Sequence, residues 1–132
     1  MAIKLSPVRP RVLVVDDEDA IRRSLTMMFE FEGFDCETAA SGPEALQVIE
    51  RNEIDLVILD VKMAGLDGLE TLRLLRERAK DVPVIMLSGH GTVKTAVEAT
   101  RLGAFDFFEK PPETERLLVA ARNALEKRRL VI

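Results

Sequence analysis

The chain has 132 residues, of which 47% are hydrophobic and 32% charged, which is typical of one globular domain and excludes a disordered chain. Its net charge of −4 argues against nucleic-acid binding by this segment, and its single cysteine excludes an internal disulfide. No segment is apolar over the length needed to cross a membrane, so we expect a cytoplasmic protein. Cys36 lies among strand-like residues, where we expect a buried and unreactive thiol.

The first part of the chain predicts a leader followed by a strand, a helix and a second strand. Residues 1–10 include Pro7 and Pro10 and lack a continuous apolar stretch, so we expect a flexible leader rather than a signal peptide or a helix. The continuously apolar run 12–15 is typical of a strand buried on both faces of a parallel sheet. A helical pattern then ends at Gly33, and a weaker strand follows at 34–38.

The alternation of strands and helices continues to the C-terminus. Ser41 and Glu44 have the spacing of a capping box, and Asp67 is expected to cap a later helix. Three more strands are expected at 56–59, 84–87 and 105–108. Four more helices are expected near residues 41–49, 67–75, 93–100 and 117–125, the one at 93–100 with a thin apolar face.

Five strand–helix units in this order predict an α/β domain at residues 11–129, with a five-stranded parallel sheet, doubly wound, and five helices. Residues 130–132 are expected to begin a linker or tail. In open sheets of this kind, ligands bind beyond the carboxyl ends of the strands. Functional residues are therefore expected at that edge.

Polar residues do follow the strands at the expected edge. Asp16, Asp17 and Glu18 follow the first strand, and Asp60 follows the third. Carboxylates brought together repel one another, and a hard divalent cation such as Mg²⁺ relieves that repulsion. A carboxylate such as Asp60 can also attack a phosphoryl group and become an acyl phosphate. Taken alone, Asp16 and Asp17 are equally consistent with helix capping, and Asp60 with a turn.

Ser88 follows the fourth strand and Lys110 follows the fifth. The hydroxyl of Ser88 could donate to a phosphoryl oxygen, or it could cap a helix. Lys110 could bind the phosphoryl group or Asp60 as a point charge, and its position between an aromatic strand and Pro111 argues against an ordinary exposed lysine.

Four segments together resemble the CheY-like receiver domains of two-component response regulators, over roughly residues 11–128. They are LVVDDE (13–18), LVILDVKMAGLDGLE (56–70), VIMLSGHG (84–91) and GAFDFFEKP (103–111). The resemblance implies a flavodoxin-like strand order of 2-1-3-4-5. It also implies a signal-transduction phosphoprotein. Such a protein catalyses only its own phosphorylation and dephosphorylation and is not otherwise an enzyme.

The resemblance assigns Asp60 as the phosphorylation site. It implies Asp17 as a direct Mg²⁺ ligand, Asp16 as an acid that acts through water, and Lys62 as the donor of a backbone carbonyl to the metal. Asp60 would be a further metal ligand.

The same resemblance implies Ser88 as the switch hydroxyl and Lys110 as the lysine that binds the phosphoryl group. Phe107 matches the switch aromatic residue, and the Lys110–Pro111 bond matches one that is usually cis. His90 lies near Ser88, but a surface contact is favoured over catalysis. Ala64 departs from the proline usual at its position, so we expect a more mobile loop there.

The segment 88–111 resembles more closely the receivers of NtrC/NtrX-type activators of sigma-54 transcription. That likeness implies a sensor histidine kinase as phosphodonor and an output segment in cis, with an AAA+ and a DNA-binding domain. The sequence contains no P-loop, so we expect no ATPase activity here. A symmetric dimer through the fourth helix, fifth strand and fifth helix is also implied.

Three alternatives stay open from the sequence. A haloacid-dehalogenase-type phosphatase also uses an aspartyl phosphate, but it needs its DxDx[TV] motif after the first strand, where this chain has DDE. A receiver that no longer switches would serve only as a binding module. A stand-alone CheY-like receiver or a phosphorelay shuttle would lack a DNA-binding output.

Overall fold

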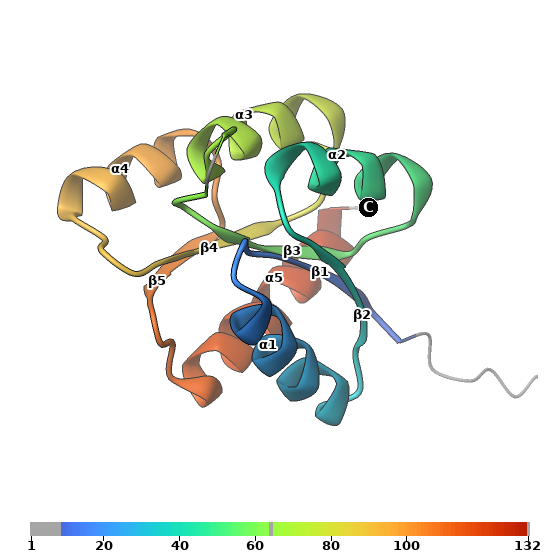
Figure 1. Ribbon diagram of the computed structural model, residues 1–132. Coiled ribbons are helices and arrows are strands. Elements are labelled where there is room, and N and C mark those ends of the chain that lie inside the picture. Colours follow the sequence, from blue (N-terminus) through green and yellow to red (C-terminus); the bar gives the residue numbers. More distant parts are fainter. Residues whose placement is uncertain (1–8, 64, 132) are drawn as a thin grey trace, which may run out of the picture.

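The structure, a computed structural model, describes residues 9–63 and 65–131, without the side chains of residues 129–131 (Figure 1). Most of the expected leader (1–8) and the loop residue Ala64 lie outside the described residues. The last helix continues to Val131, and the start of a linker at 130–132 stays a prediction. None of the helices in the described part is long and apolar enough to cross a membrane.

Five parallel strands form one sheet in the order β2-β1-β3-β4-β5, which confirms the predicted fold and strand order (Figure 1). The strands are β1 (Arg11–Val15), β2 (Asp35–Ala39), β3 (Leu56–Asp60), β4 (Val84–Ser88) and β5 (Asp106–Glu109). The helices are α1 (Asp19–Phe31), α2 (Gly42–Arg51), α3 (Gly68–Arg78), α4 (Val93–Arg101) and α5 (Thr114–Val131).

The sheet has a hydrophobic layer on each face. Helices α2, α3 and α4 cover one face of the sheet, and α1 and α5 cover the other (Figure 1). In β1, Leu13 and Val15 belong to the layer with α2, α3 and α4, while Val12 and Val14 belong to the layer with α1 and α5. All four side chains are buried because both faces of the sheet are covered. This is why the central strands β1, β3 and β4 read as continuous apolar runs rather than as alternating ones.

The helix starts follow the capping chemistry that the sequence predicts. The Ser41 hydroxyl accepts a hydrogen bond from the Glu44 amide at 3.2 Å, and the Glu44 carboxylate accepts one from the Ala40 amide at 2.8 Å. Gly33 ends α1 with a φ of 95°, a left-handed conformation that favours glycine.

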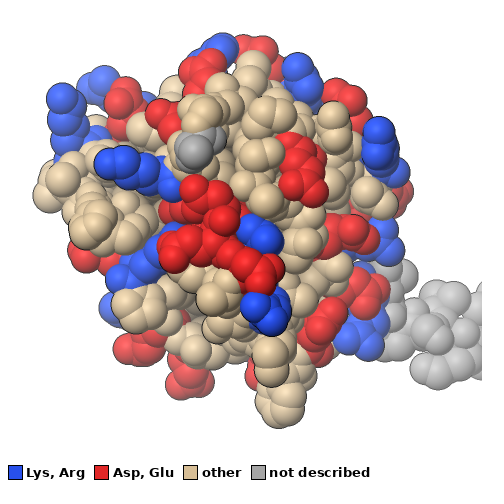
Figure 2. Space-filling view, viewed as in Figure 1, with Lys and Arg blue, Asp and Glu red and all other residues tan. Residues whose placement is uncertain are grey.

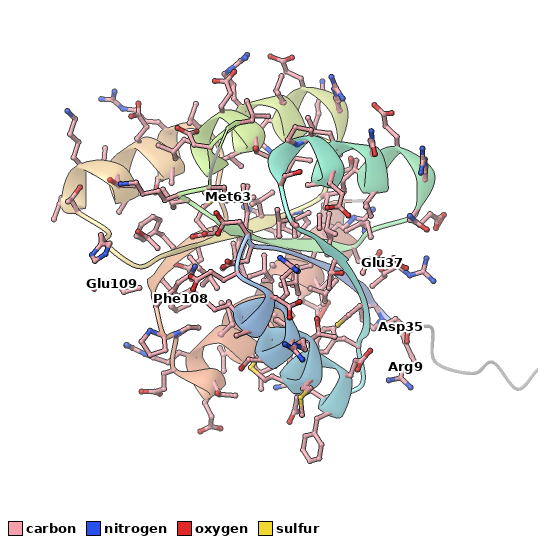
Figure 3. The ribbon with its side chains drawn as sticks, in the orientation of Figure 1. Arg9, Asp35, Glu37, Met63, Phe108 and Glu109 are labelled. Atoms are coloured by element: carbon pink, nitrogen blue, oxygen red, sulfur yellow. The ribbon has the colours of Figure 1, made fainter. Side chains whose placement is uncertain are left out.

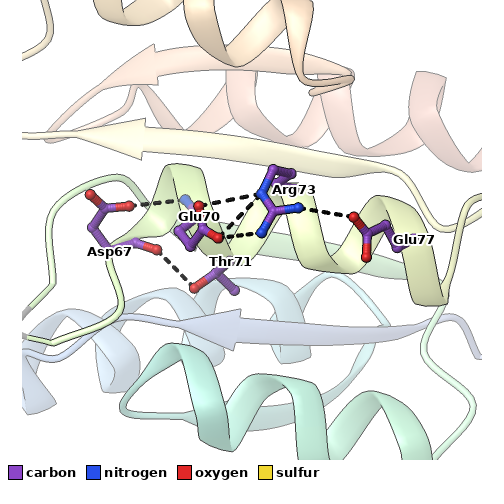
Figure 4. A network of polar contacts seen from close by, with 5 residues as sticks. All are labelled: Asp67, Glu70, Thr71, Arg73 and Glu77. Carbon is purple, nitrogen blue, oxygen red and sulfur yellow. Dashed lines mark hydrogen bonds and ion pairs between the residues drawn. The ribbon is translucent and has the colours of Figure 1, made fainter.

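Helix α3 begins with a second predicted cap. The Asp67 carboxylate accepts from the Glu70 amide at 2.9 Å, and the Thr71 hydroxyl donates to the Asp67 carbonyl (Figure 4). Arg73 then bridges Glu70 and Glu77 along the exposed side of the helix. The cap and these ion pairs hold the helix that follows the Asp60 loop.

Two strands extend further than their apolar runs. Asp60 pairs with Leu87, and Ser88 pairs with Glu109, so each polar residue ends its strand within the sheet rather than following it. Strand β2, in contrast, begins one residue later than predicted. The Phe34 amide donates to the Phe29 carbonyl at the end of α1, so it does not join the ladder.

Cys36 is half-buried rather than fully buried, because β2 is an edge strand. Burial, followed by the nearby charges of Glu30, Asp35 and Glu37, raises the pKa of the Cys36 thiol to about 11. Asp35 also pairs with Arg9 at 3.3 Å on this edge (Figure 3).

Candidate functional site

The loop between β1 and α1 gathers three carboxylates. Ligand oxygens of Asp16, Asp17 and Glu18 lie within 4.8 Å of one another. Asp16 is 1% exposed, whereas Asp17 and Glu18 are exposed. Figure 2 shows acidic side chains gathered in the middle of this face of the molecule, where the strands end. The local excess of negative charge suits a cation.

Lys110 links the two buried carboxylates of the site. Its ammonium nitrogen lies 2.7 Å from Oδ2 of Asp16 and 3.0 Å from Oδ1 of Asp60. The Lys110 amide donates to the Ser88 carbonyl at 2.8 Å, and the Lys110–Pro111 peptide is cis as expected. Lys110 directly follows β5, so its side chain lies at the carboxyl edge of the sheet.

Burial and nearby charges both shift the pKa values of Asp60 and Lys110. Burial raises the pKa of Asp60 and the charge of Asp16 raises it further, against the opposing effects of Lys110 and of the Lys62 backbone amide. Burial lowers the pKa of Lys110, but its hydrogen bonds to Asp16 and Asp60 outweigh burial and leave that pKa raised. Lys110 is therefore held as a cation.

Asp60 is buried at 4% exposure and held by a close backbone contact. The Gly68 amide donates to the Val61 carbonyl at 2.7 Å, and a Cβ at Gly68 would lie 2.0 Å from the Asp60 carbonyl oxygen. Only glycine fits there, so the start of α3 packs directly on the backbone at the end of β3.

Asp60 opens onto a hollow of about 440 Å³ at the carboxyl edge of the sheet. Its lining includes the expected site residues Asp17, Asp60, Lys62, Ser88 and Lys110. The hollow has room for a phosphoryl group and its ligands beside Asp60.

Ser88 and Phe107 lie on neighbouring strands and both approach Gly91. A Cβ at Gly91 would lie 3.0 Å from the Phe107 ring and 3.4 Å from the Ser88 Cβ. Phe107 is partly buried and packs with the layer beneath α2, α3 and α4, whereas Phe108 packs against the opposite layer (Figure 3). Gly91 thus has both the Phe107 ring and the Ser88 side chain as close neighbours.

The structure therefore brings together Asp16, Asp60 and Lys110 by direct contact, and Asp17, Lys62 and Ser88 around the same hollow. Phe107 lies beside it rather than in it. The carbonyl of Lys62 as a metal ligand stays a prediction. His90 lines the hollow, and its amide donates to the Ser88 hydroxyl at 3.2 Å.

Sequence reasoning assigned no role to Arg22, which holds the acidic loop. Its guanidinium donates to the Asp16 carbonyl at 2.7 Å and pairs with Asp19 at 3.1 Å. The sequence feature that could have indicated this role is the position of Arg22 in the first turn of α1, directly after the acidic loop. Glu18, also given no role, adds a third carboxylate to the loop.

The fold and this site define a doubly wound α/β domain with an acidic pocket, a buried aspartate and a lysine at one edge. Residues 12–122 match the response regulator receiver domain family. The chain belongs to that family.

Two groups of proteins show this likeness. The chain is 42% identical to the nitrogen assimilation regulatory protein NtrX of Azorhizobium caulinodans over 121 residues, which cover 90% of this chain and 27% of that protein. It is 39% identical over 123 residues to the C4-dicarboxylate transport transcriptional regulatory protein DctD of Rhizobium meliloti, which covers 93% of this chain and 27% of that protein. The chain thus spans about a quarter of the length of these curated relatives.

Solved structures have the same fold. The receiver domain of NtrX from Brucella abortus superposes with a TM-score of 0.83 at 43% identity, covering 87% of this chain and 98% of that one. A CheY-like receiver domain protein from Methanospirillum hungatei superposes with a TM-score of 0.90 at 29% identity, covering 94% and 99% of the two chains.

Proposed function

We propose that this receiver accepts a phosphoryl group on Asp60 from a phosphohistidine of a sensor histidine kinase. The observation that carries the proposal is the Lys110 ammonium, which lies within 3.0 Å of both Asp16 and Asp60 at the edge of an open hollow. A fixed cation beside a carboxylate nucleophile is positioned to stabilise the charge of a transferring phosphoryl group.

In the transfer, a carboxylate oxygen of Asp60 forms a bond to phosphorus while the phosphorus–nitrogen bond of the phosphohistidine breaks. The electron pair of that bond goes to the imidazole nitrogen. Lys110 lies close enough to exchange its contact with Asp60 for one with a phosphoryl oxygen. The Ser88 hydroxyl, whose strand pairs with the Asp60 strand, is a second donor for the phosphoryl oxygens.

The donor set fits Mg²⁺, a hard cation that prefers carboxylate and carbonyl oxygens. When bound, Mg²⁺ would neutralise negative charge on the phosphoryl oxygens. Both oxygens of Asp16 already accept hydrogen bonds, from the Glu18 amide and from Lys110, which supports a role through water. Asp17 is exposed, which supports a direct role, with Asp60 and the Lys62 carbonyl completing the set.

The output side of the proposal concerns α4, β5 and α5. Ala99 is the only α4 residue that is buried, while Val93 is 82% and Val97 50% exposed. Few buried contacts mean a low local stability, so phosphorylation can bias the position of this helix through Ser88 and Phe107. The exposed apolar side chains also suit a symmetric dimer through this face.

The relatives support a transcriptional output. The names of the NtrX and DctD proteins describe a nitrogen assimilation regulator and a transcriptional regulator of C4-dicarboxylate transport. We infer that this receiver controls sigma-54-dependent transcription through AAA+ and DNA-binding segments in cis. A stand-alone or phosphorelay receiver is the alternative, and the length of the native gene product distinguishes the two.

Labelling with radioactive acetyl phosphate and Mg²⁺ tests the acceptor. The wild-type chain is expected to incorporate label that EDTA prevents, and Asp60→Asn to incorporate none. Asp67→Asn, an exposed acid that lines the same hollow, is the matched control and is expected to label normally. Equal labelling of Asp60→Asn would refute the acceptor assignment, and turnover of a generic phosphomonoester would favour a phosphatase instead.

A further inference from the structure

A second hollow, of about 450 Å³, lies at the opposite edge of the sheet from Asp60. Pro83 and Phe105, which line it, directly precede β4 and β5, so the hollow is at the amino ends of these parallel strands. Its other walls come from the ends of α3 and α5. We call it the basic hollow because four of its lining residues are cationic, namely Arg76, Lys80, Lys127 and Arg128.

The charges of the basic hollow are only partly neutralised. Asp81 is the acid in its lining, and Asp55 pairs with Arg128 at 2.6 Å. Four cations against two carboxylates leave an excess of two positive charges, in a chain whose net charge is −4. Within the described part of the chain, no ion pair is formed by Lys80 or Lys127.

The arginines fix the floor of the basic hollow. The Arg76 guanidinium donates to the carbonyls of Ala79, Lys80 and Val82, and the Nε atoms of Arg76 and Arg128 are buried without a hydrogen-bond partner among the described residues. Buried donors of this kind are costly unless a partner is supplied. The guanidinium charges of both arginines nevertheless add to the positive potential of the hollow.

We propose that the basic hollow binds a small ligand that carries a di- or triphosphate group. Lys80 and Lys127 are exposed and provide two mobile point charges, the form in which lysine binds phosphate. Phe105, with the Lys127 ammonium 5.9 Å from its ring centroid, provides an apolar wall for the organic part of a nucleotide. Without Mg²⁺, the carboxylates of the hollow around Asp60 disfavour the same ligand, so the two edges of the sheet differ in what they attract.

Titration of the full chain with pyrophosphate and with ATP, followed by amide NMR at constant ionic strength and without Mg²⁺, tests the proposal. Saturable shifts are expected at Gly103, Ala104 and Phe105, with ATP binding more tightly than pyrophosphate. The double variant Lys80→Gln/Lys127→Gln is expected to weaken binding by about tenfold, since each exposed ion pair contributes modestly.

The matched control is Lys94→Gln, which removes an exposed lysine of α4 outside the basic hollow and should leave the affinity unchanged. Both lysines of the double variant are exposed, so its fold should be retained. Any of three results would overturn the proposal. These are shifts confined to Gly89 and His90, shifts that never saturate, and an unchanged affinity of the double variant.

Discussion

Replacing Lys110 by methionine is expected to destabilise the domain, because it leaves two buried carboxylates without their shared cation. The ammonium lies 2.7 Å from Asp16 and 3.0 Å from Asp60, and its side chain is only 13% exposed. At an effective dielectric constant of about 20, each of these contacts has a gross Coulomb attraction of about 6 kcal/mol. Desolvation of the lysine offsets much of this, and measured losses on breaking buried pairs are about 3–5 kcal/mol.

The effect should depend on pH with a definite sign. The pKa of Asp60 is already raised in the folded domain. Protonated Asp60 therefore contributes stability that is complete below the ordinary pKa of aspartate, and this stability is lost as the pH rises through the raised pKa. Without Lys110 the ionised carboxylates are penalised further. The difference in unfolding free energy between wild type and Lys110→Met should therefore be larger at about pH 8 than at about pH 5.

Urea unfolding in EDTA measures this difference. With a slope of about 1.5 kcal/mol per molar urea, a loss of 3 kcal/mol lowers the midpoint by about 2 M. Lys94→Met on the exposed face of α4 controls for the loss of a lysine and should change little. In an Asp60→Asn background the same Lys110 change should cost less, because one buried carboxylate is gone. A midpoint for Lys110→Met equal to wild type at both pH values would refute the reasoning.

Three further substitutions test other parts of the site. Asp17→Asn should weaken Mg²⁺ affinity at least tenfold in a fluorescence or calorimetric titration, and an unchanged affinity would remove its ligand role. Phe107→Ala should leave acetyl phosphate labelling intact but reduce the NMR shift changes that phosphorylation causes in α4, and wild-type changes would contradict the switch role. Gly68→Ala should destabilise by about 1–3 kcal/mol in urea, since its Cβ would lie 2.0 Å from the Asp60 carbonyl oxygen. Stability within error of wild type would show that the start of α3 adjusts freely.

Much of the fold could be predicted because the three central strands, β1, β3 and β4, are buried on both faces and therefore read as apolar runs. The reliance on apolar runs also made the predicted strand ends less accurate. Asp60 and Ser88 belong to their strands by hydrogen bonding, but their polarity ends the apolar pattern one residue early. Cys36 was expected to be buried, whereas its place on an edge strand leaves it partly exposed.

The candidate site was predictable as a set of strand-end residues but not as a set of contacts. Lys110 and Asp16 are 94 positions apart, and whether a long side chain reaches back to a carboxylate depends on the tertiary packing and not on local pattern. Arg22 illustrates the same limit, since its hydrogen bond to the Asp16 carbonyl has no sequence signature. The basic hollow brings together residues from α3, from α5 and from the segments before β4 and β5. None of these segments has a distinctive sequence pattern of its own.

The most direct test of the central claim is to locate the phosphoryl group chemically. Phosphorylated protein treated with borohydride converts an aspartyl phosphate to homoserine, which peptide mass spectrometry then assigns to a position. Homoserine is predicted at position 60 and nowhere else, in an amount that falls to zero when Mg²⁺ is removed before phosphorylation. Homoserine at position 16 or 17, or an unmodified Asp60 in labelled protein, would contradict the account.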